Sequence, residues 1–102
     1  MTLAEREMLR LCLLLAKNLT KRFPVKFSKI ELLNKSASEY GLYFSDSKLI
    51  KIRLKDSEGS FISVEEIADT VAHELAHSID LSHGKRFKVA YARLLSAAMR
   101  FL

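Results

Sequence analysis

The sequence has little cysteine, proline or glycine, and the shortage of cysteine limits what the chain can be. Its 102 residues include one cysteine, one proline and three glycines. The lone Cys12 excludes an internal disulfide, so nothing indicates an oxidising compartment. Cys12 lies within an apolar helical pattern, where a free cysteine is typical of a core. Internal repeats and low-complexity segments are also lacking, and we expect a single domain over residues 1–102.

No segment of the sequence is apolar over a length that would cross a membrane. The run Met8–Ala16 is interrupted by Arg10 and is shorter than the roughly 20 residues that a membrane-spanning helix needs. No secretory signal is recognisable either. We therefore expect a cytoplasmic protein that makes no contact with a membrane.

Acidic residues are fewer than basic residues. The counts are 12 aspartates and glutamates against 17 lysines and arginines, which gives a formal net charge of +5 at pH 7. The basic residues are scattered and form no long run. Such a charge favours solubility, and it also favours weak contact with nucleic acid through the basic surface.

Apolar residues recur with helical periods in three segments and with strand periods in three others. These patterns predict an α+β fold with an N-terminal helix, a small twisted sheet that is mainly antiparallel, and two further helices. Ile50, Ile52 and Leu54 alternate with basic residues, as in a strand that is buried on one face. The predicted helices are Thr2–Phe23, Val64 to about Leu81, and Lys85–Phe101, and the predicted strands are Val25–Leu33, Tyr40–Phe44 and Leu49–Lys55. The predicted turns and loops are Asn34–Glu39, Ser45–Lys48 and Asp56–Ser60.

The second predicted helix contains His73-Glu74-Leu75-Ala76-His77, an H-E-x-x-H motif. Ser63 followed by Glu66 fits a capping box at the start of this helix. Residues four apart lie on one helix face, so His73 and His77 can bind a single metal ion. Glu74 projects beside them and can take a proton from a water that the metal binds. The motif is typical of a catalytic zinc site.

A catalytic zinc ion needs a third protein ligand and an open position for water. After His77 the sequence has no glutamate, which excludes the common arrangement with a glutamate on a later helix. Asp80 and His83 are the candidates that remain. Asp80 would need a bent side chain or a frayed helix to reach the metal. His83 is favoured, because a turn after the helix can carry its imidazole back over the site.

Two further roles around the site have candidate residues. A carboxylate commonly accepts the second ring N–H of a ligating histidine, and Asp80 or Asp69 is a candidate for this contact. Peptide hydrolysis also needs a hydrogen-bond donor for the developing oxyanion. The candidate donors are Tyr91, Tyr43 and Arg86.

The stretch Asp69–Leu95 resembles the core of the SprT-like and WLM-type zinc metallopeptidases. The similarity lies in an H-E-x-x-H helix, a third histidine after a short spacer, and an H-G-x-x-F segment entering a helix, here His83-Gly84-Lys85-Arg86-Phe87. The resemblance implies a minimal zincin-like domain in which one zinc ion is bound by His73, His77 and His83 and Glu74 is the base. The SprT-like group includes proteases that act on proteins bound or crosslinked to DNA, which implies DNA-associated substrates.

The residues and the resemblance together predict a zinc-dependent metallopeptidase that hydrolyses protein or peptide substrates. An extended substrate would pair with a sheet edge around Tyr40–Phe44 by strand addition. One alternative is a zinc-stabilised binding module with little or no peptidase activity. Another is a nucleic-acid-binding module that uses basic residues of the last helix, namely Lys85, Arg86, Lys88 and Arg93.

Overall fold

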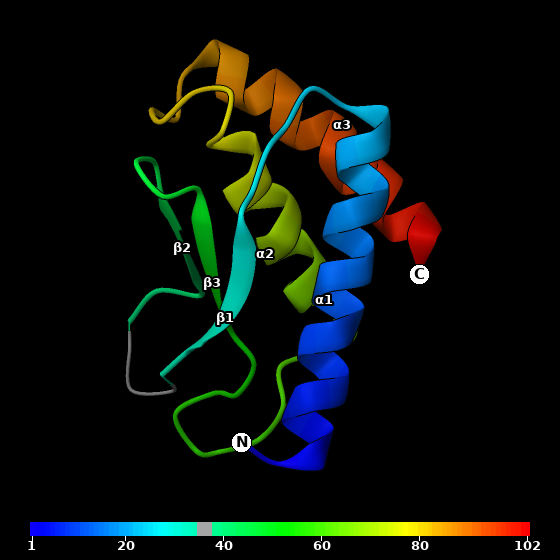
Figure 1. Cartoon of the computed structure of the whole chain (residues 1–102), viewed down its shortest axis with the longest axis vertical. Helices are drawn as coiled ribbons and strands as arrows, with labels where there is room; N and C mark the ends of the chain where they lie inside the picture. The colour runs from blue at the N-terminus through cyan, green and yellow to red at the C-terminus, as the bar shows by residue number, and fades with distance from the viewer. Residues whose placement is uncertain (35–37) are drawn as a thin grey trace.

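Three helices and a three-stranded sheet make up the computed structural model, which describes residues 1–34 and 38–102 (Figure 1). In chain order they are α1 (Leu3–Arg22), β1 (Lys29–Leu33), β2 (Gly41–Phe44), β3 (Leu49–Arg53), α2 (Val64–Ala76) and α3 (Lys85–Phe101). The predicted α+β class is confirmed. The predicted turn at Asn34–Glu39 falls partly outside the described residues. None of the helices in the described part of the chain combines the length and apolar character that a membrane span requires.

Helix α1 begins and ends at signals that are local in the sequence. The Thr2 side chain accepts a hydrogen bond from the backbone N–H of Glu5, and the Glu5 carboxylate accepts one from the backbone N–H of Thr2. This reciprocal pair is a capping box. At the other end, Pro24 disfavours helical geometry in the residue before it, and Phe23 is extended.

The sheet is mixed, which corrects the prediction of a mainly antiparallel sheet. Its strand order is β1-β3-β2, with β2 antiparallel and β1 parallel to β3. The alternation that identifies a buried strand face is the same for either strand direction, so the sequence pattern does not specify the pairing. Strand β1 also begins at Lys29 instead of Val25, because the N–H of Lys26 donates to Ser78 Oγ and does not join a strand ladder. In the strand order given above, β3 lies in the middle, so β2 is an edge strand.

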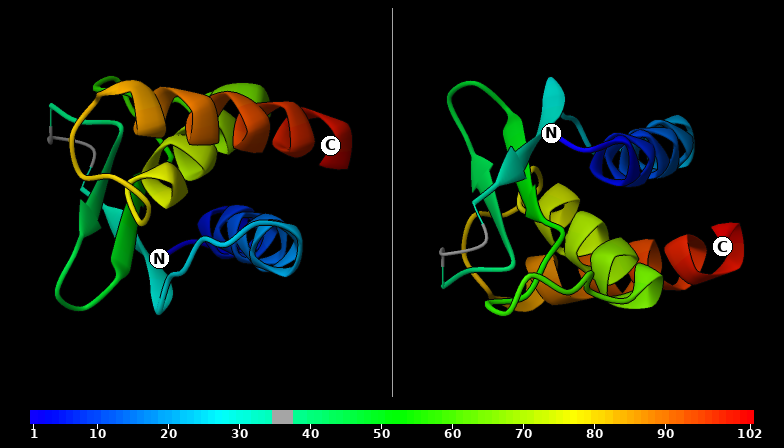
Figure 2. Two further views of the ribbon diagram at one scale, coloured as in Figure 1. Left: turned by 90° about the horizontal axis from the view of Figure 1, so that it is seen from above. Right: turned by 90° about the horizontal axis from the view of Figure 1, so that it is seen from below.

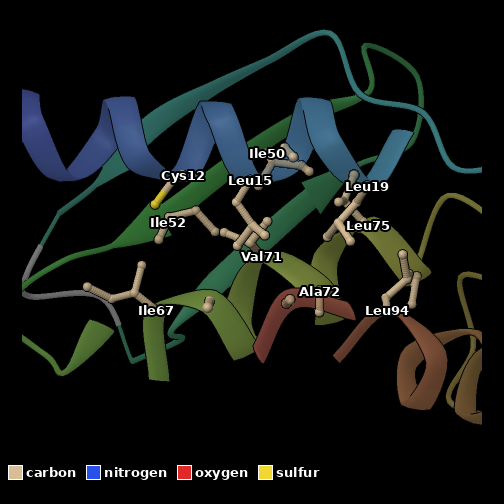
Figure 3. Close-up of a cluster of buried hydrophobic side chains, with 14 of the residues drawn as sticks. Cys12, Leu15, Leu19, Ile50, Ile52, Ile67, Val71, Ala72, Leu75 and Leu94 are labelled. Atoms are coloured by element: carbon tan, nitrogen blue, oxygen red, sulfur yellow. The ribbon is translucent and has the colours of Figure 1, made fainter. Parts of the chain in front are cut away.

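Helix α2 lies at the centre of the fold, in contact with α1, α3, β2 and β3 (Figure 2). The core between these elements is almost entirely aliphatic. Its labelled side chains in Figure 3 are Cys12, Leu15 and Leu19 of α1, Ile50 and Ile52 of β3, Ile67, Val71, Ala72 and Leu75 of α2, and Leu94 of α3. Cys12 is buried there as predicted, and burial raises the pKa of its thiol to about 12. The apolar flank of α2 is therefore held in place by packing against several elements of the fold.

Candidate metal centre

Helix α2 ends at Ala76, about five residues before the end predicted from the sequence. The backbone N–H groups of residues 77–79 bond to carbonyls three residues back, and Ser78 Oγ donates to the carbonyl of Leu75. Bonds of this 3₁₀ type tighten the last turn and satisfy the carbonyl groups at the helix end. The chain is then able to turn back across the end of α2 before α3 begins.

Three histidines meet at this turn. His73 lies in α2, His77 caps its C-terminus, and His83 lies in the loop before α3. Their candidate ligand nitrogens lie within 4.8 Å of one another, and in residues 1–34 and 38–102 they form the one such group of metal-binding side chains. The ring centroids are 5.0, 5.4 and 4.8 Å apart. The structure thus brings His83, and not the Asp80 side chain, to the two histidines of the motif.

The donor set fits a zinc ion. Zinc binds imidazole nitrogen at about 2.0–2.1 Å in a tetrahedron, which places ligand nitrogens roughly 3.4 Å apart. The separations of up to 4.8 Å are close enough for small ring rotations to complete this geometry. Burial, and then the neighbouring histidines, lower the pKa of His73, which favours the neutral imidazole that binds metal. Three histidine ligands would leave one position of a tetrahedral zinc ion for water, as catalytic zinc sites require.

Asp80 orients this site through two different groups. Its backbone carbonyl oxygen is 3.1 Å from His77 Nδ1, so a proton on Nδ1 can be donated to it while Nε2 stays available for metal. Its carboxylate accepts hydrogen bonds from the hydroxyl and the backbone N–H of Ser82, which lower the pKa of Asp80. The Asp80 carboxylate therefore holds the loop that carries His83. The hydrogen bond to a ring nitrogen of His77, which was expected from a carboxylate, is made by the backbone carbonyl of Asp80.

Phe87 packs against all three histidines, a role that the sequence pattern does not predict. It is the third residue of α3 and is 3% exposed. Its ring centroid lies 4.9 Å from that of His73, 4.5 Å from that of His77 and 4.9 Å from that of His83. A buried ring in this place limits rotation of the imidazoles and excludes water behind them. The signal for it in the sequence is the phenylalanine of the H-G-x-x-F segment.

Glu74 is the buried charged residue in the described part of the chain, with 6% of its surface exposed. Burial raises the pKa of its carboxyl from 4.5 to about 7. Strand β2 crosses close to it at Gly41, where a Cβ atom would stand 2.6 Å from Thr70 Cγ2 and 3.1 Å from Glu74 Oε2. Only glycine permits this approach of a strand to a helix. Gly41 is thus a second site residue that the sequence pattern did not identify.

A cleft lies on both sides of His73 and Glu74, along β2. One part has a volume of about 430 Å³ and the other about 360 Å³, and both are lined by Gly41, His73 and Glu74. The first part is completed by Tyr40, Glu66, Asp69, Thr70 and Tyr91, and the second by Glu39, Leu42, Tyr43, His77, Leu81 and His83. The arrangement leaves space for a chain that passes the histidines from one side to the other.

The three candidate oxyanion donors lie in three different places. Tyr91 lines the larger part of the cleft, with its ring centroid 5.3 Å from that of His73, and its hydroxyl donates to the Asp69 carboxylate. Burial, together with that hydrogen bond and the Asp69 charge, raises the pKa of Tyr91 to about 12. Tyr43 lines the smaller part. Arg86 instead lines a separate groove beside α3.

Three solved structures of Wss1 are similar to this chain. A Wss1 mutant from Saccharomyces cerevisiae matches with a TM-score of 0.84 and 19% identity, over 96% of this chain and 80% of that one. Wss1 from the same yeast matches with a TM-score of 0.74 and 23% identity, over 86% and 74%. A Wss1 mutant from S. pombe matches with a TM-score of 0.67 and 18% identity, over 79% and 71%. At these identities the likeness establishes the fold of the chain.

Sequence comparison agrees with this structural likeness. No curated protein matches the chain at a significant level. The family model described as the WLM domain matches residues 16–100, which is most of the chain. The WLM-type resemblance predicted from the motif is therefore confirmed, and the chain belongs to the WLM domain family.

Proposed function

We propose that this protein is a zinc-dependent metallopeptidase that hydrolyses peptide bonds in proteins or peptides. The observation that carries the proposal is that three histidine side chains converge beside a buried glutamate in one cleft. A purely structural zinc site needs only its ligands. A buried carboxylate costs stability when it ionises, so Glu74 is best explained by a chemical role. Membership of the WLM domain family supports the same activity.

Each site residue has a role that follows from its position. His73, His77 and His83 would hold the metal, which when bound lowers the pKa of water and polarises a carbonyl group. Glu74 accepts a proton from the attacking water and passes it to the leaving amine. Its pKa of about 7 suits a general base that works near neutral pH. Tyr91 is the favoured oxyanion donor, because its hydroxyl lies in the cleft and can exchange Asp69 for the substrate.

Strand β2 offers a binding edge for an extended substrate. It is one of the two edge strands of the sheet, and Gly41 and Tyr43 line the cleft together with the motif residues. A peptide added along this edge would gain main-chain hydrogen bonds, and its side chains would alternate between the cleft and solvent. The scissile bond would then lie beside Glu74.

The test is to measure bound zinc and hydrolysis on the same protein samples. Wild type should bind one zinc ion and cleave casein or members of a peptide library. Glu74→Gln should keep the zinc but lose activity by about 10²- to 10⁴-fold, the usual contribution of a general base. Glu65→Gln on the exposed start of α2 is the matched control and should behave as wild type. Unchanged turnover by Glu74→Gln would reject its role, and zinc binding without hydrolysis in wild type would favour the binding-module alternative.

A second candidate function, contact with single-stranded nucleic acid, is favoured by the outer face of the sheet. Lys51 and Arg53 of β3, and Lys55 just after it, alternate with buried aliphatic residues and so lie on the face away from the helices. Each is paired with an exposed aromatic ring: Lys51 Nζ is 5.8 Å from the ring centroid of Phe44, Arg53 Cζ is 5.4 Å from that of Tyr40, and Lys55 Nζ is 5.0 Å from that of Phe61. Alternating cations and rings suit a strand of phosphates and stacked bases. DNA-associated proteins would be substrates consistent with such a surface.

This second function has a separate test. A fluorescein-labelled oligothymidylate should bind in a salt-dependent manner. Tyr40→Ala and Phe44→Ala should each weaken binding by about fivefold or more, because each removes a stacking platform. Lys17→Ala, an exposed change on α1, should have the smaller effect of one distant charge. A loss in Lys17→Ala with unchanged binding by Tyr40→Ala and Phe44→Ala would show general charge attraction and reject the surface.

A further inference from the structure

A groove with a volume of about 380 Å³ lies between α3 and the chain segment that follows α1. Its floor is apolar and includes Val25 and Leu94, which are 4% and 1% exposed. Val89 stands at its edge with 46% of its surface exposed. This is a flank of α3 other than the one that carries Phe87 and Tyr91 to the histidines. The groove is therefore separate from the cleft.

The charged residues that line this groove are all basic. Lys85, Arg86 and Arg93 come from α3, all are exposed, and the lining includes no acidic residue. No ion pair neutralises any of the three within the described residues. The charge of Arg86 contributes less to lowering the pKa of Asp80 than the hydrogen bonds from Ser82 do. Unneutralised cations around an apolar floor are complementary to an acidic chain that carries an apolar anchor.

We infer that this groove binds a short acidic segment of a partner protein, with one or two aliphatic side chains of that segment inserted between α3 and Val25. The volume is near the lower end of the roughly 300–1,000 Å³ found for ligand pockets, which suits a few anchoring side chains. Helical or extended motifs commonly bind in this way, with anchors that give affinity and charges that give orientation. Phe23 is the one aromatic ring in the lining, so the groove offers little for base stacking.

The groove and the cleft can be occupied at the same time. Val89 and Arg93 face the groove, whereas Phe87 and Tyr91 contact the histidines from another flank of the same helix. A partner bound at the groove would hold its attached protein close to the cleft without blocking it. The function of the groove is thus recruitment, and it goes beyond the proposed hydrolysis.

The probe is a fluorescein-labelled peptide of about twelve residues, with three leucines at helical spacing among aspartates and glutamates. Fluorescence anisotropy with the full chain should show saturable binding, and mass spectrometry afterwards should find the peptide intact. Val89→Glu and Arg93→Glu should each weaken binding by about tenfold or more, since one fills the apolar edge with charge and the other reverses a rim charge. Lys88→Glu is the matched control, because Lys88 is an exposed cation of α3 outside the groove, and it should change affinity by less than about twofold.

The outcomes separate this inference from its rivals. Thermal unfolding of each variant first establishes that it is folded, which is expected because both groove positions are exposed. No saturable peptide binding, equal binding of a peptide with alanine in place of leucine, or an equal loss in Lys88→Glu would each overturn it. Binding of oligothymidylate that is lost in the groove variants, without peptide binding, would reassign the groove to nucleic acid. The readout is binding, so none of these results bears on whether the protein hydrolyses peptides.

Discussion

The two flanks of helix α2 have opposite energetic characters. On one flank Val71 and Leu75 are fully buried among aliphatic side chains. On the other, His73 and Glu74 line a cleft, and burial raises the pKa of the Glu74 carboxyl to about 7. Burial of the first flank stabilises the fold, whereas desolvation of the second destabilises its charged form. The comparison shows how a small protein supports a costly site: the same helix carries the packing that compensates for it.

The largest expected effect is the loss of metal binding when a histidine is removed from the cleft. His83→Ala should lower zinc affinity by at least about 100-fold, because two imidazoles remain where three are needed, and hydrolysis should fall to background. Zinc titration against a competing chelator measures the affinity. His83→Cys supplies another zinc ligand and should recover much of the binding. Retention of tight binding by His83→Ala would mean that His83 is not a ligand.

The apolar flank is tested by Leu75→Ala. Deleting this fully buried side chain should lower the free energy of unfolding by about 2–5 kcal/mol, through lost burial and the cavity that remains. Denaturant unfolding of the metal-free protein measures it. Leu14→Ala, at a position on α1 that is 50% exposed, is the control and should change stability by no more than about 0.5 kcal/mol. Similar costs for the two variants would contradict the packing described for α2.

The cost of the cleft flank should be visible as a pH dependence. The folded protein binds the Glu74 proton more tightly than the unfolded chain does, because the pKa rises from 4.5 to about 7. The associated stability is fully present below pH 4.5 and is lost as pH rises through 7, and it amounts to about 3 kcal/mol. We expect this loss in the metal-free wild type but not in Glu74→Gln. Unfolding both proteins between pH 4 and 8 in a chelator measures the difference, which also cancels the opposite trend expected from the lowered pKa of His73. Parallel curves would contradict the raised pKa.

The smallest predicted effect concerns the contact that joins β2 to the cleft flank. Gly41→Ala should lower the free energy of unfolding by about 1–3 kcal/mol, because the added methyl group overlaps Thr70 Cγ2. Hydrolysis should fall as well, since the strand edge is displaced from Glu74. Thr70→Ser removes the overlapping atom, so the double variant should be more stable than Gly41→Ala alone. Absence of this rescue would show that the close approach is not limiting.

The elements that obey local rules were predictable from the sequence. Ser63 caps α2, Pro24 ends α1, and α3 has the predicted bounds, since each of these follows from neighbouring residues. The grouping of His73 and His77 follows from helix geometry in the same way. His83 lies beside them, and it is one of the two candidate ligands that the sequence offers after the motif.

What depends on distant contacts was not predictable. The parallel pairing of β1 leaves no mark on alternation along the strand, and the role of Gly41 appears only when β2 meets α2. Phe87 fits a helical core pattern equally well whether its ring contacts leucines or histidines. The early end of α2 depends on Ser78. Its hydroxyl donates a hydrogen bond to the carbonyl of Leu75 and accepts one from the backbone N–H of Lys26, in the segment after α1. Single-residue signals of this kind do not distinguish a helix interior from its last turn.

The early end of α2 also has a consequence for the rate at which a bound metal exchanges. His73 is held by a helix packed on several sides, whereas His83 is exposed in a short loop. Loops move on nanosecond to microsecond timescales, but a packed helix opens only by local unfolding. We therefore expect an ion to leave by losing His83 first, with the two histidines at the end of α2 as its last contacts. The dissociation rate of the metal would then depend on the motion of the loop that carries His83, whereas the metal affinity would depend on all three histidines.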